Sequence, residues 1–160
     1  MSSYTMMSDS VTSNDYLNKI SDFLFVGGIQ SSEQHWQEFG LIVNCTKHIP
    51  FHKNYKSEHI RIPINDNSGE CDRFLVLMEE THVLHRMNDC IVNNIPVLVH
   101  CHAGSQRSCA LVACYLMKYH GMKVDNAMNH VRTHRPIAFF GGANLLSAIQ
   151  RFSTECASLV

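Results

Sequence analysis

Short apolar stretches alternate along this chain with longer stretches of helical periodicity, and this alternation indicates the fold. Residues 20–26 predict a pair of strands that ends at Gly27-Gly28, and residues 41–45 predict a buried strand. An alternating stretch at 59–64 and a short apolar run at 96–99 predict two more strands.

Five stretches between and after these strands carry apolar residues at the spacing of one helix face. They are 31–39, capped by Ser31 or Ser32 with Gly40 as the stop; 72–93; 107–119, ended by Gly121; 124–134, stopped by Pro136; and a last helix capped by Asn144. Strands that alternate with helices indicate the α/β class, with a central, mostly parallel sheet flanked by helices. The polar residues 1–16 predict a flexible N-terminal arm, and residues 17–160 predict a single domain.

The composition indicates which partners and which compartment to expect. With 160 residues, a formal net charge of -1 and 45% hydrophobic residues, the chain predicts a soluble domain without a basic field, so we expect neither nucleic acid nor a membrane as a partner. The seven cysteines are odd in number, irregularly spaced and not preceded by a signal peptide, which favours free thiols in a reducing compartment. We expect the cytoplasm, with the nucleus, or a virion if the protein is viral, as alternatives.

Residues 100–108, His-Cys-His-Ala-Gly-Ser-Gln-Arg-Ser, indicate the chemistry. Cys101 falls where a predicted strand turns into a predicted helix, and at such a junction backbone N–H groups and a helix N-terminus converge and attract an anion. Arg107 offers a planar guanidinium to two phosphoryl oxygens, and Ser108 offers a hydroxyl to the sulfur of Cys101. The pattern therefore predicts attack of a thiolate on a phosphate.

The other members of this loop have supporting parts. His102, Ala103, Gly104, Ser105 and Gln106 are expected to surround the phosphate together with Arg107, Gly104 because it has no Cβ, and His100 is expected to orient the loop from behind. Adjacent residues of a strand point to opposite faces, and no paired cysteine or histidine motif completes a zinc site, so we expect no metal and no cofactor.

These nine residues match the signature His-Cys-X-X-Gly-X-X-Arg-Ser/Thr at every fixed position, so the chain resembles the cysteine-dependent protein phosphatases. It is most similar to the small dual-specificity phosphatases, including single-domain members of large DNA viruses, over about residues 17–155. The resemblance implies that fold, a phosphocysteine intermediate on Cys101, and an aspartate that acts as general acid and base. Residues 61–67 have the form of the family's acid loop, which makes Asp66 the expected acid; the competing aspartates are Asp15, Asp22, Asp72, Asp89 and Asp125, with Asp72 the strongest rival.

The resemblance also implies a phosphoprotein substrate. A chain this short is expected to have a shallow pocket that accepts phosphotyrosine and phosphoserine/threonine. The alternatives are a phosphoinositide phosphatase, in which only His102 could serve as the added basic group, an RNA 5′-triphosphatase, and a phospho-dependent binding module.

Three features depend on comparison with relatives. Cys45 stands where some relatives carry a cysteine that captures the oxidised nucleophile, although a buried core thiol is the plainer interpretation. The resemblance leaves open a homodimer formed through the N-terminal arm of residues 1–16, because such an arm forms dimer contacts in some viral relatives, but no residue of the arm requires it. Phe139-Phe140-Gly141-Gly142 replaces a Pro-Asn pair in a segment that normally supports the active-site loop, and the two phenylalanines are expected either in the core or at an apolar rim.

Overall fold

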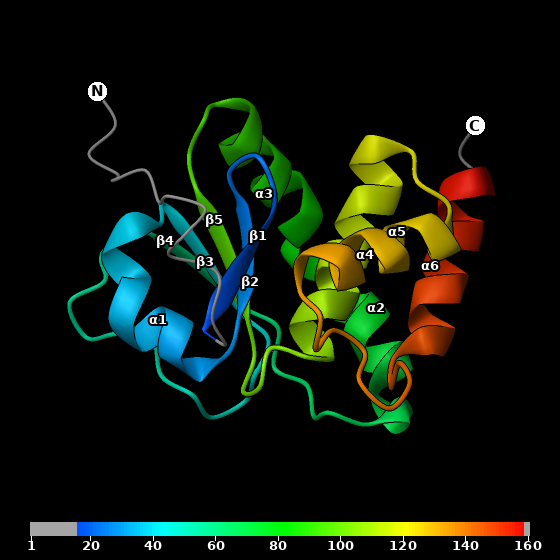
Figure 1. Ribbon diagram of the computed structural model, residues 1–160, viewed down its shortest axis with the longest axis horizontal. Helices are drawn as coiled ribbons and strands as arrows, with labels where there is room; N and C mark the ends of the chain where they lie inside the picture. The colour runs from blue at the N-terminus through cyan, green and yellow to red at the C-terminus, as the bar shows by residue number, and fades with distance from the viewer. Residues whose placement is uncertain (1–15, 159–160) are drawn as a thin grey trace.

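The computed structural model describes residues 16–158, and a five-stranded sheet with the order β1-β2-β5-β3-β4 forms its centre (Figure 1). β1 and β2 are an antiparallel hairpin, and every other neighbouring pair is parallel. The predicted mostly parallel α/β sheet is confirmed. The strands are β1 (Leu17–Ser21), β2 (Leu24–Gly27), β3 (Leu41–Asn44), β4 (Glu58–Arg61) and β5 (Val97–His100).

Helices cover the sheet on both sides. They are α1 (Ile29–His35), α2 (Cys71–Thr81), α3 (Val83–Val92), α4 (Arg107–His120), α5 (Val124–His134) and α6 (Leu146–Ser158), with the short 3-10 helices η2 (Trp36–Glu38) and η3 (Ser68–Glu70). Figure 1 shows α1 beside the sheet on one side and α4, α5 and α6 gathered on the other. The predicted helices 107–119 and 124–134 are confirmed as α4 and α5, and Gly121 ends α4 in the left-handed conformation with φ 66°.

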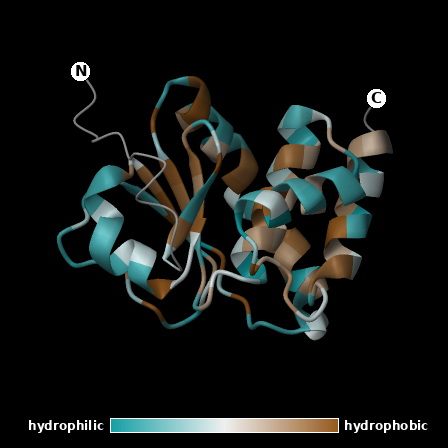
Figure 2. Cartoon of the chain, in the orientation of Figure 1, coloured by the Kyte–Doolittle hydropathy of each residue, from teal (hydrophilic) through white to brown (hydrophobic). Residues whose placement is uncertain are grey.

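The alternation of side chains along the strands divides the core into two. Val26, Val43 and Val99 point to the face that α2 to α6 cover, whereas Phe25, Ile42 and Leu98 point to the smaller core behind. Figure 2 shows the central strands as the most continuous apolar region of the chain, with polar residues spread over the helices. Because β5 is buried on both faces, its sequence is a continuous apolar run rather than an alternating one.

Several sequence-based boundaries are wrong. The last helix, α6, begins at Leu146, so Asn144 does not directly precede it, and the Asn144 side chain donates to Asp66 instead of capping the helix.

The stretch 72–93 is two helices, α2 and α3, separated by His82 in the left-handed conformation with φ 53°. From Met78 to Leu84 the chain advances six residues, which turn an ideal helix about 120° short of two full turns. The break at His82 restores both side chains to the same core.

The first helix begins earlier than predicted. α1 starts at Ile29, and Ser31 and Ser32 lie inside it, where their hydroxyls donate to the carbonyls of Gly28 and Ile29 instead of capping N–H groups. Helix α1 ends at His35, and η2 carries the chain on toward Phe39. The backbone N–H of Ile29 donates to the carbonyl of His102 at 2.8 Å, which ties the first turn of α1 to the loop after β5.

The predicted strand 59–64 is shorter than expected. β4 ends at Arg61, and although the N–H of Ile62 still donates to the carbonyl of Asn44, Pro63 has no N–H with which to continue the ladder. The chain therefore leaves the sheet here and becomes the loop that carries Asp66.

Candidate active site

The loop between β5 and α4 lies at the carboxyl end of the parallel strands, as the sequence predicted. β5 ends at His100, Cys101 follows it directly, and Arg107 is the first residue of α4. The N–H of Cys101 points to the carbonyl of Gly27 at 3.4 Å, so β2 holds the start of the loop. The carboxyl ends of parallel strands are where ligands of α/β folds bind.

Cys101 and Ser108 are in contact. The Sγ of Cys101 lies 3.2 Å from the Oγ of Ser108, and both side chains are buried. Ser108 is in the first turn of α4, whose N–H groups and dipole favour negative charge at this point. A hydroxyl that donates to sulfur stabilises the thiolate form.

The guanidinium of Arg107 is only partly hydrogen-bonded within the described residues. Its Nη1 donates to the carbonyl of Ile64 at 3.0 Å, while its Nε is buried and has no hydrogen-bond partner in the part of the chain that the structure describes. A buried donor without a partner is costly, and an oxyanion at this place would satisfy it.

A chain of hydrogen bonds through Asn144 links Asp66 to the loop that carries Cys101. Its Oδ1 accepts a hydrogen bond from the side-chain amide of Asn144 at 2.9 Å, and the N–H of Asn144 donates to the Oε1 of Gln106 at 2.9 Å. The hydrogen bond between Arg107 and Ile64 fixes the chain two residues before Asp66. Asp66 itself is exposed, as a group that meets a substrate must be.

The rival aspartates lie elsewhere. Asp72, in the first turn of α2, is ion-paired with Arg151 of α6 at 2.6 Å. Asp22 is in the turn between β1 and β2, at the opposite end of the sheet from Cys101. Asp89 belongs to α3 and Asp125 to the first turn of α5, and Asp15 lies outside the described residues.

His100 has the geometry of an orienting group. It is fully buried, and burial lowers its pKa to about 4, so the ring is neutral near pH 7. Its Nδ1 lies 3.3 Å from the carbonyl of Cys101, and since a carbonyl only accepts, the proton is on Nδ1. Nε2 is then an acceptor, and no group in the described residues donates to it.

Comparison with known proteins identifies the family. The sequence profile described as "Dual specificity phosphatase, catalytic domain" matches residues 24–153. The chain belongs to the dual specificity phosphatase family. It is 34% identical over 122 residues to a viral protein named for tyrosine phosphatase activity, 123R of Invertebrate iridescent virus 6, with 76% of this chain and 81% of that protein covered.

Other relatives agree with this assignment. Human dual specificity protein phosphatase 14 is 31% identical over 119 residues, which are 72% of this chain but only 57% of that protein. The crystal structure of human DUSP28 superimposes with a TM-score of 0.78 at 24% identity, covering 88% of this chain and 95% of the other, and shows the shared fold.

The side chains of the loop between β5 and α4 differ in their exposure and partners. His102 and Ala103 are exposed. Ser105 donates its hydroxyl to the carbonyl of Ile137 at 2.8 Å, and the amide of Gln106 donates to the carbonyls of Phe140 and Gly142. The side chains of Ser105 and Gln106 are therefore directed to the neighbouring segment, which leaves only the backbone N–H groups of these two residues to face an anion in the loop.

Arg135 is a structural part of this phosphatase site that the sequence did not reveal. Its side chain is 1% exposed, its Nε donates to the carbonyl of Gly104 at 2.6 Å, and its Nη1 donates to the Oδ1 of Asn18 at 2.8 Å. Its Nη2 lies 3.3 Å from the carbonyl of Ala103. Nothing in its sequence surroundings marks it, because its partners are 31 to 117 residues away.

Four consecutive carbonyls of the loop point outward to such donors. Ile29 donates to His102, Arg135 to Ala103 and Gly104, and the N–H of Phe139 to Ser105 at 2.8 Å. In a trans peptide the carbonyl and the following N–H point in opposite directions. The N–H groups of residues 103–106 consequently turn toward the centre of the loop, which is the arrangement of an anion-binding nest.

The segment that replaces the family's Pro-Asn pair still supports the loop. Phe139 is buried with φ 59°, whereas Phe140 is 83% exposed. Phe139 therefore belongs to the core and Phe140 to the surface, so each of the two expected positions is occupied by one of them.

Cys45 lies directly behind the catalytic loop. Its N–H donates to the carbonyl of His100 at 2.8 Å, and burial, followed by the charge of Cys101, raises its pKa, so it is a neutral thiol. Cys109, whose Sγ lies 3.4 Å from the carbonyl of Gly104, is a second buried thiol whose pKa burial and then Cys101 raise. Capture of oxidised Cys101 by Cys45 therefore stays a prediction, with Cys109 as a rival.

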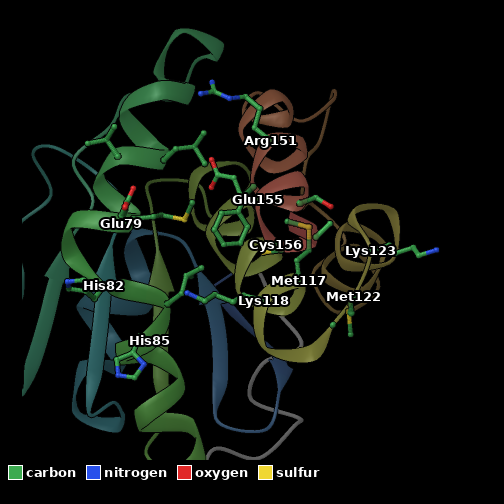
Figure 3. A pocket seen from close by; sticks show the side chains of 18 of the residues that line it. Glu79, His82, His85, Met117, Lys118, Met122, Lys123, Arg151, Glu155 and Cys156 are labelled. Atoms are coloured by element: carbon green, nitrogen blue, oxygen red, sulfur yellow. The ribbon is translucent and has the colours of Figure 1, made fainter. Parts of the chain in front are cut away.

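A groove of about 1260 Å³ lies elsewhere on the molecule, between α2, the C-terminal end of α4, and α6 (Figure 3). Met117 and Met122 line it with charged residues of both signs, among them Glu79, Lys118 and Glu155. Cys101 adjoins the other end of α4, so this groove is separate from the catalytic loop. Residues 16–158 contain no group of three or more metal-ligating side chains and no helix with the length and apolarity of a membrane span.

Proposed function

We propose that this chain is a protein phosphatase that hydrolyses phosphotyrosine and phosphoserine/threonine through a phosphocysteine intermediate. The observation that carries the proposal is the position of the Cys101 sulfur, 3.2 Å from the Ser108 hydroxyl in the first turn of α4. Arg107 is the first residue of the same helix, and its buried Nε has no partner among the described residues. A thiolate and a dianionic phosphate are both best accommodated where N–H groups and a guanidinium converge.

In the first step the Cys101 thiolate attacks phosphorus. The S–P bond forms as the P–O bond to the substrate breaks, and Asp66 gives its proton to the departing oxygen. Arg107 and the N–H groups of residues 103–106 stabilise the charge on the three remaining phosphoryl oxygens. Ser108 keeps the sulfur in its reactive form before the attack.

In the second step water attacks the phosphocysteine. Asp66, now a carboxylate, takes a proton from the water, the S–P bond breaks, and inorganic phosphate and the Cys101 thiolate result. The hydroxyl of Ser108 stabilises the sulfur as a leaving group. One carboxyl group therefore acts as acid and then as base.

Substitution of the nucleophile tests the mechanism. Cys101→Ser should abolish hydrolysis of p-nitrophenyl phosphate, because a serine hydroxyl in this nest is a far weaker nucleophile, while inorganic phosphate still binds. A Ser variant that turns over at the wild-type rate would refute the phosphocysteine mechanism. Cys156→Ser, a change in the half-buried thiol of α6, is the matched control and should retain activity.

A parallel substrate series tests the substrate class. A phosphotyrosine peptide and a phosphothreonine peptide should both be hydrolysed, at higher kcat/KM than a phosphoinositide or a 5′-triphosphorylated RNA. Of the variable loop residues only His102 is basic, and a single imidazole is a poor site for a polyanion. Preference for either of the last two substrates would overturn the protein-phosphatase assignment.

A further inference from the structure

The segment before α6 connects the catalytic loop with the acid loop through side chains. Gln106 binds three backbone groups of this segment: its Nε2 donates to the carbonyls of Phe140 at 3.1 Å and Gly142 at 2.9 Å, and its Oε1 accepts from the N–H of Asn144 at 2.9 Å. Gln106 is itself only 7% exposed and directly precedes Arg107. These three hydrogen bonds fix the backbone of Asn144 relative to the phosphate nest.

From this fixed position Asn144 reaches the acid loop. Its Nδ2 donates to the Oδ1 of Asp66 at 2.9 Å. Within the described residues the Oδ2 of Asp66 takes part in no hydrogen bond, so the bond from Asn144 leaves one oxygen available to carry a proton. Asp66 lies in an exposed loop, where a carboxylate without such a bond samples several rotamers.

We propose that Asn144 is a positioning residue for Asp66 and that Gln106 anchors it to the phosphate loop. This inference rests on the proposed role of Asp66 as general acid. The amide of Asn144 holds one carboxylate oxygen of Asp66 and leaves the other to give its proton to the leaving group. Proton transfer depends steeply on this geometry, since a misplaced catalytic group loses much of its advantage.

The test uses two substrates that differ in their need for a proton. Phenyl phosphate has a poor leaving group and requires protonation, whereas 2,4-dinitrophenyl phosphate does not. Asn144→Ala should lower kcat on phenyl phosphate about three- to tenfold, the range of one lost hydrogen bond, and leave kcat on dinitrophenyl phosphate near wild type. Asn126→Ala, an exposed asparagine of α5, is the matched control.

Two further variants separate the inference from the proposed function. Asp66→Asn should lower kcat on phenyl phosphate more strongly, and the double variant with Asn144→Ala should be no slower than Asp66→Asn alone, because the two residues act as one unit. Gln106→Met should change the ratio of the two kcat values in the same direction as Asn144→Ala.

Each contrary result has a distinct meaning. Equal losses on both substrates, or losses that multiply in the double variant, would show that Asn144 acts only on the general structure and would overturn the inference while Asp66 keeps its role. An unchanged ratio in Gln106→Met would overturn the anchoring part. If Asp66→Asn itself shows no dependence on the leaving group, the acid assignment fails and the positioning role fails with it.

Discussion

Gly104 is the loop position at which a single methyl group should be most damaging. Its φ is +72°, and a Cβ built on it would lie 2.5 Å from the carbonyl carbon of Gly27 and 2.6 Å from the Nη2 of Arg135. The first of these atoms belongs to the backbone of β2, and the second is a buried guanidinium nitrogen that is bonded to the loop. Displacing either atom would disturb the sheet or the hydrogen bonds of a buried side chain.

The magnitude follows from two separate costs. Alanine in the left-handed region costs roughly 1–2 kcal/mol, and forcing an extra carbon into a packed site costs about 1–3 kcal/mol more. We therefore expect Gly104→Ala to lower the free energy of unfolding by about 2–5 kcal/mol. Gly121 is the matched control, because its φ is +66° and a Cβ at this position would have no neighbour within 4 Å, so that Gly121→Ala carries the conformational cost alone.

Urea unfolding, followed by the fluorescence of the single tryptophan, Trp36, measures both variants. Activity on p-nitrophenyl phosphate should fall strongly in folded Gly104→Ala, because the loop must move away from β2, and should persist in Gly121→Ala. Equal losses of stability in the two variants would refute the reasoning from packing. Full activity in Gly104→Ala would refute the claim that its contacts with β2 and Arg135 shape the nest.

Two further predictions concern titratable groups. Asp66→Ala should lower kcat about 100-fold or more with little change in KM, whereas Asp72→Ala, which removes only an exposed ion pair with Arg151, should leave kcat unchanged; steady-state kinetics on phenyl phosphate decides, and the reverse result would move the acid to Asp72. His100 has its pKa lowered from 6.5 to about 4 by burial, so between these values the unfolded chain binds a proton that the folded protein does not. The free energy of unfolding should therefore be fully retained above pH 6.5 and fall by roughly 3 kcal/mol as the pH decreases to about 4. His100→Asn should show a shallower dependence in urea titrations at pH 7 and 4.5, and an unchanged slope would exclude His100 as the cause.

The pattern of apolar residues and of helix-ending residues predicts most helices and strands of this fold. The buried strand β5, the helix α4 with Gly121 after it, and the helix α5 ahead of Pro136 depend on residues that are neighbours in the chain. Patterns failed where tertiary contacts decide. The carbonyl of His102 binds the N–H of Ile29, where α1 begins two residues before the serine that a capping argument selects. The apolar positions on the two sides of His82 differ in register, so a single helix over 72–93 could not have buried both sets, and the chain breaks there.

The motif of residues 100–108 predicts only part of the active site, for the same reason. The sulfur and the hydroxyl that meet at the nest come from residues 101–108, as does the guanidinium of Arg107, so a local motif predicts the contact between Cys101 and Ser108. The direction of the N–H groups between them does not follow from that motif. It depends on the donors that hold the loop carbonyls outward, and these belong to Ile29, Arg135 and Phe139, which only the folded chain brings together.

This dependence explains how the family's Pro-Asn pair can be replaced without loss of the loop. What the loop requires from residues 137–144 is a backbone N–H for the carbonyl of Ser105 and carbonyls for the Ser105 hydroxyl and the Gln106 amide. Backbone groups supply these contacts whatever the side chains are, provided that the turn can form. Phe139, Gly141 and Gly142 adopt positive φ values of 59°, 77° and 103°, and two of the three are glycines, for which such values cost little. This segment therefore supports the loop through its backbone conformation, and the exposed side chain of Phe140 takes no part in these contacts.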